Sequence, residues 1–171
     1  SLPKTLDPFK YADQSKDLQG QIAIHLMSRL AEMLVDSEGV VDIELKFARD
    51  AQNLRILNGK LSGQVNLLCQ RCLKSVKKTI DSEFHLGIVM NDEQAQNLPR
   101  TYEPLLVENE KLVLLEVIEE ELILSLPMFA YHNDCEPDDY RNAEEEEIFE
   151  SIVEETKENP FDVLSELKLK K

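Results

Sequence analysis

The residues of this chain best suited to chemistry are three cysteines and one histidine, arranged as two short pairs. Cys69 and Cys72 are separated by two residues in the run Leu-Leu-Cys-Gln-Arg-Cys-Leu-Lys, and His132 and Cys135 repeat that spacing. Thiolate and imidazole are natural ligands of a tetrahedral zinc ion, and structural zinc sites begin with short chelating pairs. The four residues therefore predict a closed zinc site with three sulfur ligands, one nitrogen ligand and no position left for water.

The Cys69–Cys72 pair has two other interpretations. It can be a redox-active dithiol, or two small residues beside a turn with no ligand. Catalytic Cys-x-x-Cys pairs lie at a helix N-terminus, where the dipole lowers the thiol pKa, whereas extended sequence surrounds this pair. The chain also lacks a GxSxG elbow, an HExxH motif and a Gly-rich phosphate loop, so we predict no catalytic residue and no small-molecule substrate.

Charge is distributed unevenly along the chain. The net charge is −15, and the stretch from Glu103 to Glu166 holds 21 acidic and 3 basic residues. Such a stretch favours a basic protein partner, or simply solubility. A small basic cluster surrounds the cysteines and is a candidate contact for RNA or a partner, although a solvated strand face would have the same composition. Its members are Lys60, Arg71, Lys74, Lys77 and Lys78.

Alternating apolar and polar residues predict the strands. Val41–Phe47 alternates strictly, as in a half-buried strand. The segments 54–61, 65–68 and 74–87 continue in this style, and we expect turns at Asn58-Gly59 and at Ser62-Gly63. Together they predict an antiparallel meander with the Cys69–Cys72 pair at the corner between two strands.

Apolar residues at three- and four-residue steps predict two main helices, at His25–Val35 and Leu112–Leu126. We expect a polar loop at Lys10–Lys16. With the meander, these helices predict an α+β fold in which an antiparallel sheet packs against two helices.

The composition predicts three parts. Residues 1–132 form a single α+β domain, residues 133–158 an acidic, partly disordered linker, and residues 159–171 a short amphipathic helix. In that helix Phe161, Leu164 and Leu167 share one side and would dock on the chain's own domain or on a partner.

No targeting or membrane segment is expected. A charged-then-apolar signal peptide does not open the sequence, and the longest nearly apolar run, Leu122–Tyr131, is too short to cross a bilayer. These observations predict a cytoplasmic protein with no membrane partner, whose cysteines are reduced thiols or metal ligands.

Several short motifs, in order along nearly the whole chain, resemble the YceD family, the large ribosomal RNA subunit accumulation proteins of bacteria and plastids. The similarity is greatest to its gammaproteobacterial branch. The motifs are Leu2–Pro8, Cys69–Cys72, Tyr102–Pro104, Glu119–Pro127, His132–Cys135 and Asn159–Leu164.

The resemblance implies a non-enzymatic role in the synthesis, processing or stability of 23S rRNA, and hence in accumulation of the large ribosomal subunit. The implied partners are large-subunit rRNA, ribosomal proteins or other assembly factors. Two alternatives from the residues remain: an acidic module that chaperones a basic ribosomal protein, and a Cys-x-x-Cys redox or metal-handling protein.

Overall fold

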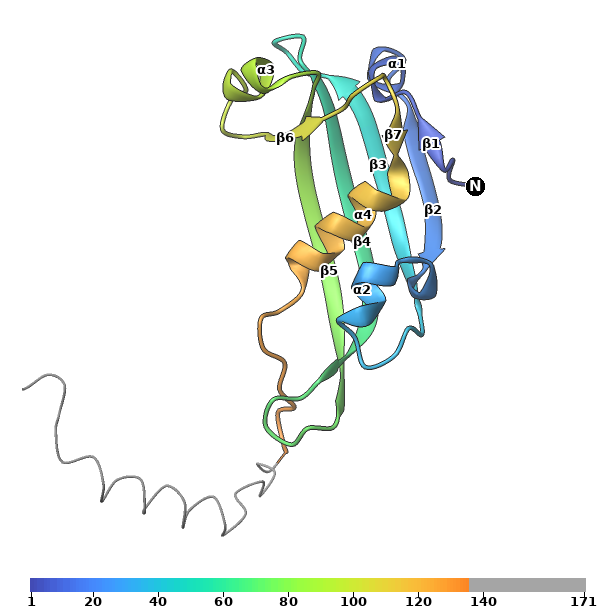
Figure 1. Ribbon diagram of the computed structural model, residues 1–171, viewed down its shortest axis with the longest axis vertical. Coiled ribbons are helices and arrows are strands. Elements are labelled where there is room, and N and C mark those ends of the chain that lie inside the picture. Colours follow the sequence, from blue (N-terminus) through green and yellow to red (C-terminus); the bar gives the residue numbers. More distant parts are fainter. Residues whose placement is uncertain (136–171) are drawn as a thin grey trace, which may run out of the picture. The chain divides into compact units, whose positions relative to one another are not determined.

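A five-stranded sheet runs through the centre of the structure, a computed structural model that describes residues 1–135 (Figure 1). The first four strands pair antiparallel in sequence order, which confirms the predicted meander, whereas the fifth pairs parallel with the fourth and makes the sheet mixed. In sheet order the strands are β2 (Asp17–Ala23), β3 (Val40–Arg49), β4 (Arg55–Leu68), β5 (Ser75–Val89) and β6 (Glu103–Leu106).

A two-stranded sheet and five helical segments complete the described residues, and the α+β fold class is confirmed. None of the helices within residues 1–135 is long and apolar enough to cross a membrane. The small sheet pairs β1 (Thr5–Leu6) with β7 (Leu112–Val113). The helical segments are α1 (Pro8–Asp13), the 3-10 turn η1 (Ile24–Leu26), α2 (Ser28–Glu32), α3 (Asp92–Gln96) and α4 (Leu114–Ser125).

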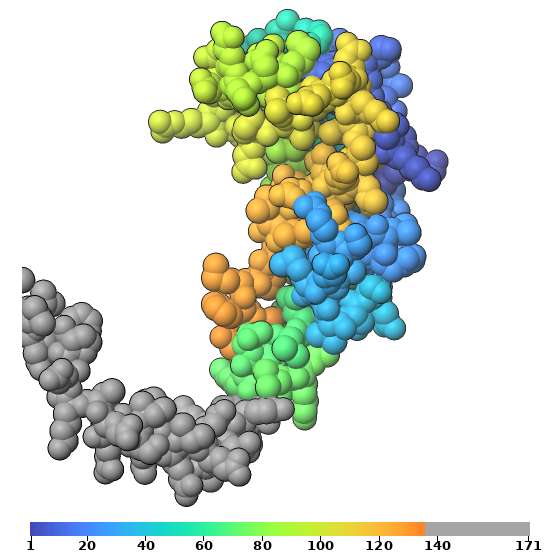
Figure 2. Space-filling model, in the orientation of Figure 1, coloured from blue at the N-terminus to red at the C-terminus, as the bar shows by residue number. Residues whose placement is uncertain are grey.

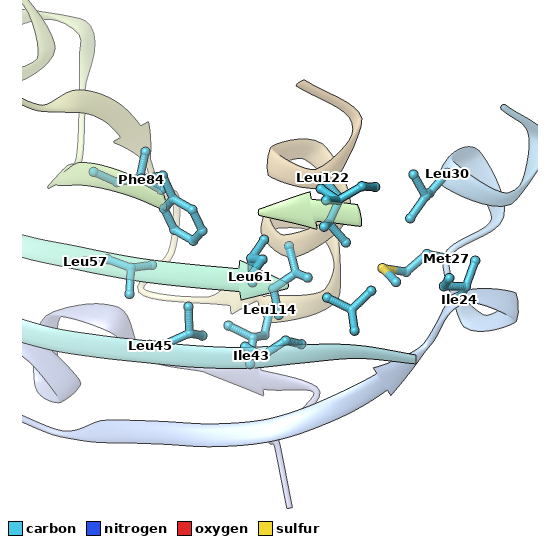
Figure 3. Close-up of a cluster of buried hydrophobic side chains, with 14 of the residues drawn as sticks. Ile24, Met27, Leu30, Ile43, Leu45, Leu57, Leu61, Phe84, Leu114 and Leu122 are labelled. Atoms are coloured by element: carbon cyan, nitrogen blue, oxygen red, sulfur yellow. The ribbon is translucent and has the colours of Figure 1, made fainter. Parts of the chain in front are cut away.

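One face of the large sheet is buried, and α4 packs against it. In β3 the alternation predicted from sequence holds, because Val41 to Phe47 bury every second side chain and expose the polar ones between. From α4, Leu114, Ile118 and Leu122 are each 1% exposed or less. Figure 3 shows the labelled side chains of α4, β3 and β4 meeting in one apolar cluster. Each such residue contributes about 1.5–3 kcal/mol to folding by leaving water.

The helix predicted over 25–35 is two short pieces, η1 and α2, which meet at Met27. A distant carboxylate determines this break: Glu119 of α4 accepts hydrogen bonds from the backbone N–H of Arg29 at 3.0 Å and of Leu30 at 3.3 Å. These are first-turn donors of α2, which have no partner inside a helix. The prediction of one continuous helix over 25–35 is therefore wrong, and α4 is the longest helix in residues 1–135.

The turns predicted at Asn58-Gly59 and Ser62-Gly63 are also wrong, because β4 continues through both dipeptides as one 14-residue strand. Gly59 faces the ring of Phe84 on β5, and a Cβ at Gly59 would lie 2.1 Å from Cζ of that ring. The glycine therefore makes room for a neighbouring side chain, which is the other common reason for glycine inside a strand.

Of the polar loop expected at 10–16, residues 10–13 instead belong to α1, and residues 14–16 lie outside helix and strand. Asp7 caps this helix by accepting hydrogen bonds from the N–H of Phe9 at 3.0 Å and of Lys10 at 3.3 Å, with Pro8 in the first turn. The predicted linker beyond residue 135 and the predicted helix of Phe161, Leu164 and Leu167 lie outside the described residues, so those boundaries stay predictions.

Candidate metal centre

The two Cys/His pairs come from segments 60 positions apart in sequence. Cys69 and Cys72 lie in the turn that joins β4 to β5, and His132 and Cys135 follow α4. A parallel bridge between Cys69 and Ala130 brings the segments together, and the backbone N–H of Gln70 donates to the Ala130 carbonyl at 2.8 Å. We call the end of the β4–β5 hairpin, residues 68–78, the hairpin end, and residues 128–131 the strip.

All four predicted ligands meet in one cluster, and their ligand atoms lie within 4.8 Å of one another. The Sγ atoms of Cys69 and Cys135 are 3.5 Å apart, and Cys72 Sγ lies 3.3 Å from His132 Nδ1. A tetrahedral zinc with sulfur and nitrogen ligands has edges of about 3.5–3.8 Å between ligand atoms. The chemistry of the donors and these separations fit a zinc ion, and the three thiols form no disulfide.

The second ring nitrogen of His132 orients the imidazole. Nε2 lies 2.9 Å from the carbonyl oxygen of Ser75, so the N–H at that position donates to the backbone. Nδ1 is then the nitrogen that keeps a lone pair, and it faces Cys72. A hydrogen bond of this kind is the usual support behind a metal-binding histidine, because it sets the tautomer and the ring orientation.

Backbone N–H groups favour a thiolate at Cys69, which is fully buried. Burial by itself raises the pKa of this thiol, but N–H groups of Cys72 and His132, with further hydrogen bonds, outweigh it and lower the pKa to about 5. One of them, the N–H of His132, lies 3.4 Å from Cys69 Sγ. Cys69 is therefore in the form that binds metal at neutral pH.

The pKa of Cys135 changes in the opposite direction. Burial raises it, and the neighbouring sulfurs of Cys69 and Cys72 raise it further. Three thiolates this close repel one another unless a cation lies between them. Because all four ligands come from the protein, such a cation would have no open position for a substrate, as in structural zinc sites.

The local fold also distinguishes this pair from a redox dithiol. Cys69 and Cys72 lie in a turn between two strands, and no helix within residues 1–135 begins at either cysteine. The helix dipole that activates a catalytic Cys-x-x-Cys pair does not act on this one.

Four of the five predicted basic residues lie together at the hairpin end. Arg71, Lys74 and Lys77 are exposed and Lys78 is half-buried. Lys60 lies apart, in the middle of β4, directly opposite Glu44 of β3 and Glu83 of β5. Nine residues of strand separate it from Cys69, which corresponds to about 30 Å.

Sequence reasoning missed the exposed apolar side chains of the strip. Met128, Phe129 and Tyr131 are 88%, 60% and 44% exposed, whereas Ala130 is buried. The guanidinium of Arg71 lies over the Tyr131 ring, 5.8 Å from its centroid. The sequence signal that could have revealed them is the run after Pro127, in which apolar residues continue past the end of the helix.

The fold and the cluster define a class: a small α+β protein in which a Cys₃His cluster lies between a β-hairpin and the segment that follows a helix. The family model described as "Large ribosomal RNA subunit accumulation protein YceD" matches residues 57–168, which include both Cys/His pairs. A protein of that name from Haemophilus influenzae is 38% identical over 174 residues, covering 99% of this chain and 97% of the relative. The chain belongs to the YceD family, as the sequence motifs predicted. No solved structure matches it.

Proposed function

We propose that this chain is a non-enzymatic ribosome biogenesis factor of the cytoplasm that supports the synthesis, processing or stability of 23S rRNA. Accumulation of the large ribosomal subunit would depend on it for that reason. The observation that carries the proposal is the similarity to the Haemophilus influenzae protein, whose name describes large ribosomal RNA subunit accumulation and which aligns with 99% of this chain. A metal ion held by four protein ligands would have no open position for a substrate, which supports a role without catalysis.

The proposal includes a structural zinc ion held by Cys69, Cys72, His132 and Cys135. The short separations between their ligand atoms and the backbone support of His132 favour it. Zinc would fasten the strip to the hairpin end, where one backbone bridge and a few side-chain contacts join two segments distant in sequence. Structural zinc sites contribute folding free energy directly, so the ion would keep this end in one conformation.

The basic side chains at the hairpin end are the proposed contact to rRNA. Residues 1–135 hold 14 basic and 21 acidic side chains, a net charge of −7, yet residues 71–78 carry four positive charges and no negative one. Phosphate contacts dominate nucleic-acid affinity, so this end is where RNA would approach. Lys60 is a weaker candidate because of its two acidic neighbours.

Depletion and add-back in cells test the proposed function. Cells that lack the protein should show a lower ratio of 23S to 16S rRNA and a smaller large-subunit peak in sucrose gradients, and the wild-type chain should restore both. His132→Ala should restore them poorly. His85→Ala should restore them fully, because His85 lies on the open face of the sheet beside Asn58. An unchanged rRNA ratio in the depleted cells would contradict the proposal.

A second candidate function, chaperoning a basic ribosomal protein, is supported by an acidic groove lined by α4 and β6. Burial raises the pKa of the Glu121 carboxyl there, and the nearby carboxylates of Glu103 and Glu120 raise it further. A cationic side chain would relieve that repulsion.

Native purification with and without RNase separates the two candidates. A ribosomal protein that RNase leaves bound and rising salt removes supports the chaperone, since salt screens charge pairs. A partner released by RNase supports attachment through RNA.

A further inference from the structure

The strip holds two exposed aromatic residues next to the basic hairpin end. Phe129 and Tyr131 are exposed, and Ala130 between them is buried against the hairpin end through its bridge to Cys69. The rings on either side of the buried Ala130 therefore both reach solvent. Figure 2 shows this segment, in orange, against the green hairpin.

This exposure is unusual for the molecule. Of the four phenylalanines in residues 1–135, Phe9, Phe47 and Phe84 are at most 9% exposed and only Phe129 lies in solvent. Within those residues Arg71 lies over the Tyr131 ring, and Phe129 and Tyr131 remain 60% and 44% exposed. Exposed aromatic side chains grouped beside one another mark a surface that binds something.

The charge beside the rings is positive and unpaired. Within residues 1–135, Arg71, Lys74, Lys77 and Lys78 take part in no ion pair, whereas Arg29, Arg49 and Arg55 each pair with a carboxylate. A shallow groove of about 450 Å³ is lined by Lys77, Lys78 and Tyr131, with Asp134 at the same groove. Phosphates could therefore contact lysines while a base lies on the adjacent ring.

We infer that this surface binds unpaired nucleotides of RNA, with bases stacking on Phe129 and Tyr131 and phosphates contacting Lys77, Lys78 and Arg71. The inference rests on the proposed function and narrows its partner to a single-stranded segment. A duplex keeps its base faces stacked inside, whereas unpaired bases offer them to aromatic side chains. Arg71, already over the Tyr131 ring, can extend the stack by a cation–π contact.

Fluorescence anisotropy with a labelled 12-nucleotide RNA tests the inference, using the full zinc-loaded chain and a duplex of the same sequence for comparison. Single-stranded RNA should bind at least about tenfold more tightly than the duplex. The double variant Phe129→Ala/Tyr131→Ala should weaken single-strand binding about tenfold, the size expected for lost stacking, without changing the salt dependence. Leu124→Ala is the matched control, because Leu124 is 67% exposed on α4 and outside this surface.

The lysines have a different expected effect. Lys77→Ala/Lys78→Ala should reduce the slope of log affinity against log salt by about 1.4, which corresponds to two phosphate contacts on a single strand. Lys46→Ala, an exposed lysine on the open sheet face opposite Asp17 of β2, should change affinity less than twofold. All these side chains are solvent-exposed or half-buried, so melting temperatures should match the wild type.

Three results would overturn the inference: no binding to RNA at low salt, equal affinity for duplex, or full affinity in the aromatic variant. A chain that dimerises through the rings, with dimers lost in that variant, would also overturn it. The proposed function is judged separately by rRNA levels in depleted cells. If those levels fall while the aromatic variant restores them fully and binds RNA normally, the function stands and this inference does not.

Discussion

At the scale of single residues, His132 connects the proposed zinc site to the hairpin. Its Nδ1 faces Cys72 and its Nε2 lies against the carbonyl of Ser75, so one side chain contacts a ligand on one side and the backbone of β5 on the other. In the proposed site the imidazole would be both a metal ligand and a contact between the strip and the hairpin end.

Replacing His132 should therefore weaken zinc binding more than replacing a residue that only hydrogen-bonds to a ligand. We predict that His132→Ala lowers zinc affinity by more than about tenfold, the lower range for loss of an outer-shell partner. His132→Cys should retain zinc, because four thiolates also form a tetrahedral site. Competition with a chromophoric chelator measures both, and His85→Ala is the control. Equal zinc affinity in His132→Ala and the wild type would show that His132 is not a ligand.

At the scale of elements, Glu119 shows how one helix determines where another begins. Its side chain is nearly buried, and it accepts hydrogen bonds from two N–H groups of α2 and from Nε of Arg29 at 3.1 Å. Without this carboxylate, the first turn of α2 would leave buried donors without partners.

We predict that Glu119→Ala lowers the free energy of unfolding by about 2–3 kcal/mol, because it removes charge-assisted hydrogen bonds and leaves the N–H of Leu30 unsatisfied. Glu116→Ala, on the exposed side of the same helix, should change it by less than about 0.5 kcal/mol. Urea unfolding followed by circular dichroism measures the difference. Similar midpoints for the two variants would mean that Glu119 does not hold α2.

The elements also show which features were predictable from sequence. The alternation in β3 is local, so the strand was predicted correctly. The breaks were not predictable: α2 begins where Glu119 reaches it from 90 positions away, and Gly59 is a strand residue because Phe84 needs its space. A glycine in a turn and a glycine beneath a ring look the same until the register of β4 and β5 is known.

Some features of the candidate site were likewise predictable from sequence and others were not. The cluster of the four candidate ligands was predictable because residue type and spacing are those of zinc-binding pairs. The separation of Lys60 from the other basic residues depends on register, and so does the exposure of Phe129 and Tyr131 beside them. Neither can be derived from composition.

At the scale of the whole molecule, the apolar core and the proposed zinc site lie at different ends of the sheet, and we expect each to stabilise its own end. The core beneath α4 is formed by Leu, Ile and Phe side chains, whereas the strip contacts the hairpin end through a bridge and a few hydrogen bonds. We expect metal removal to loosen the hairpin end and the strip, and to leave the core intact.

Hydrogen exchange followed by mass spectrometry checks this expectation. After a strong chelator, the amides of Gln70 and His132 should exchange faster, since their acceptors are the Ala130 carbonyl and the Cys69 sulfur. Amides of β3, such as Leu45, should be unchanged on the scale of minutes. Faster exchange throughout β3 would mean that zinc supports the entire fold. An unchanged exchange rate at Gln70 would mean that zinc does not hold the hairpin end against the strip.

The central claim is that one zinc ion fastens the strip to the hairpin end through three sulfurs and one nitrogen. The most direct measurement is the zinc content of the full chain purified under reducing conditions without added metal, with X-ray absorption to identify the ligand atoms. We predict one zinc per chain with three sulfur and one nitrogen neighbours, at about 2.3 Å and 2.0–2.1 Å. A chain that contains no zinc and shows no affinity for added zinc would contradict the claim.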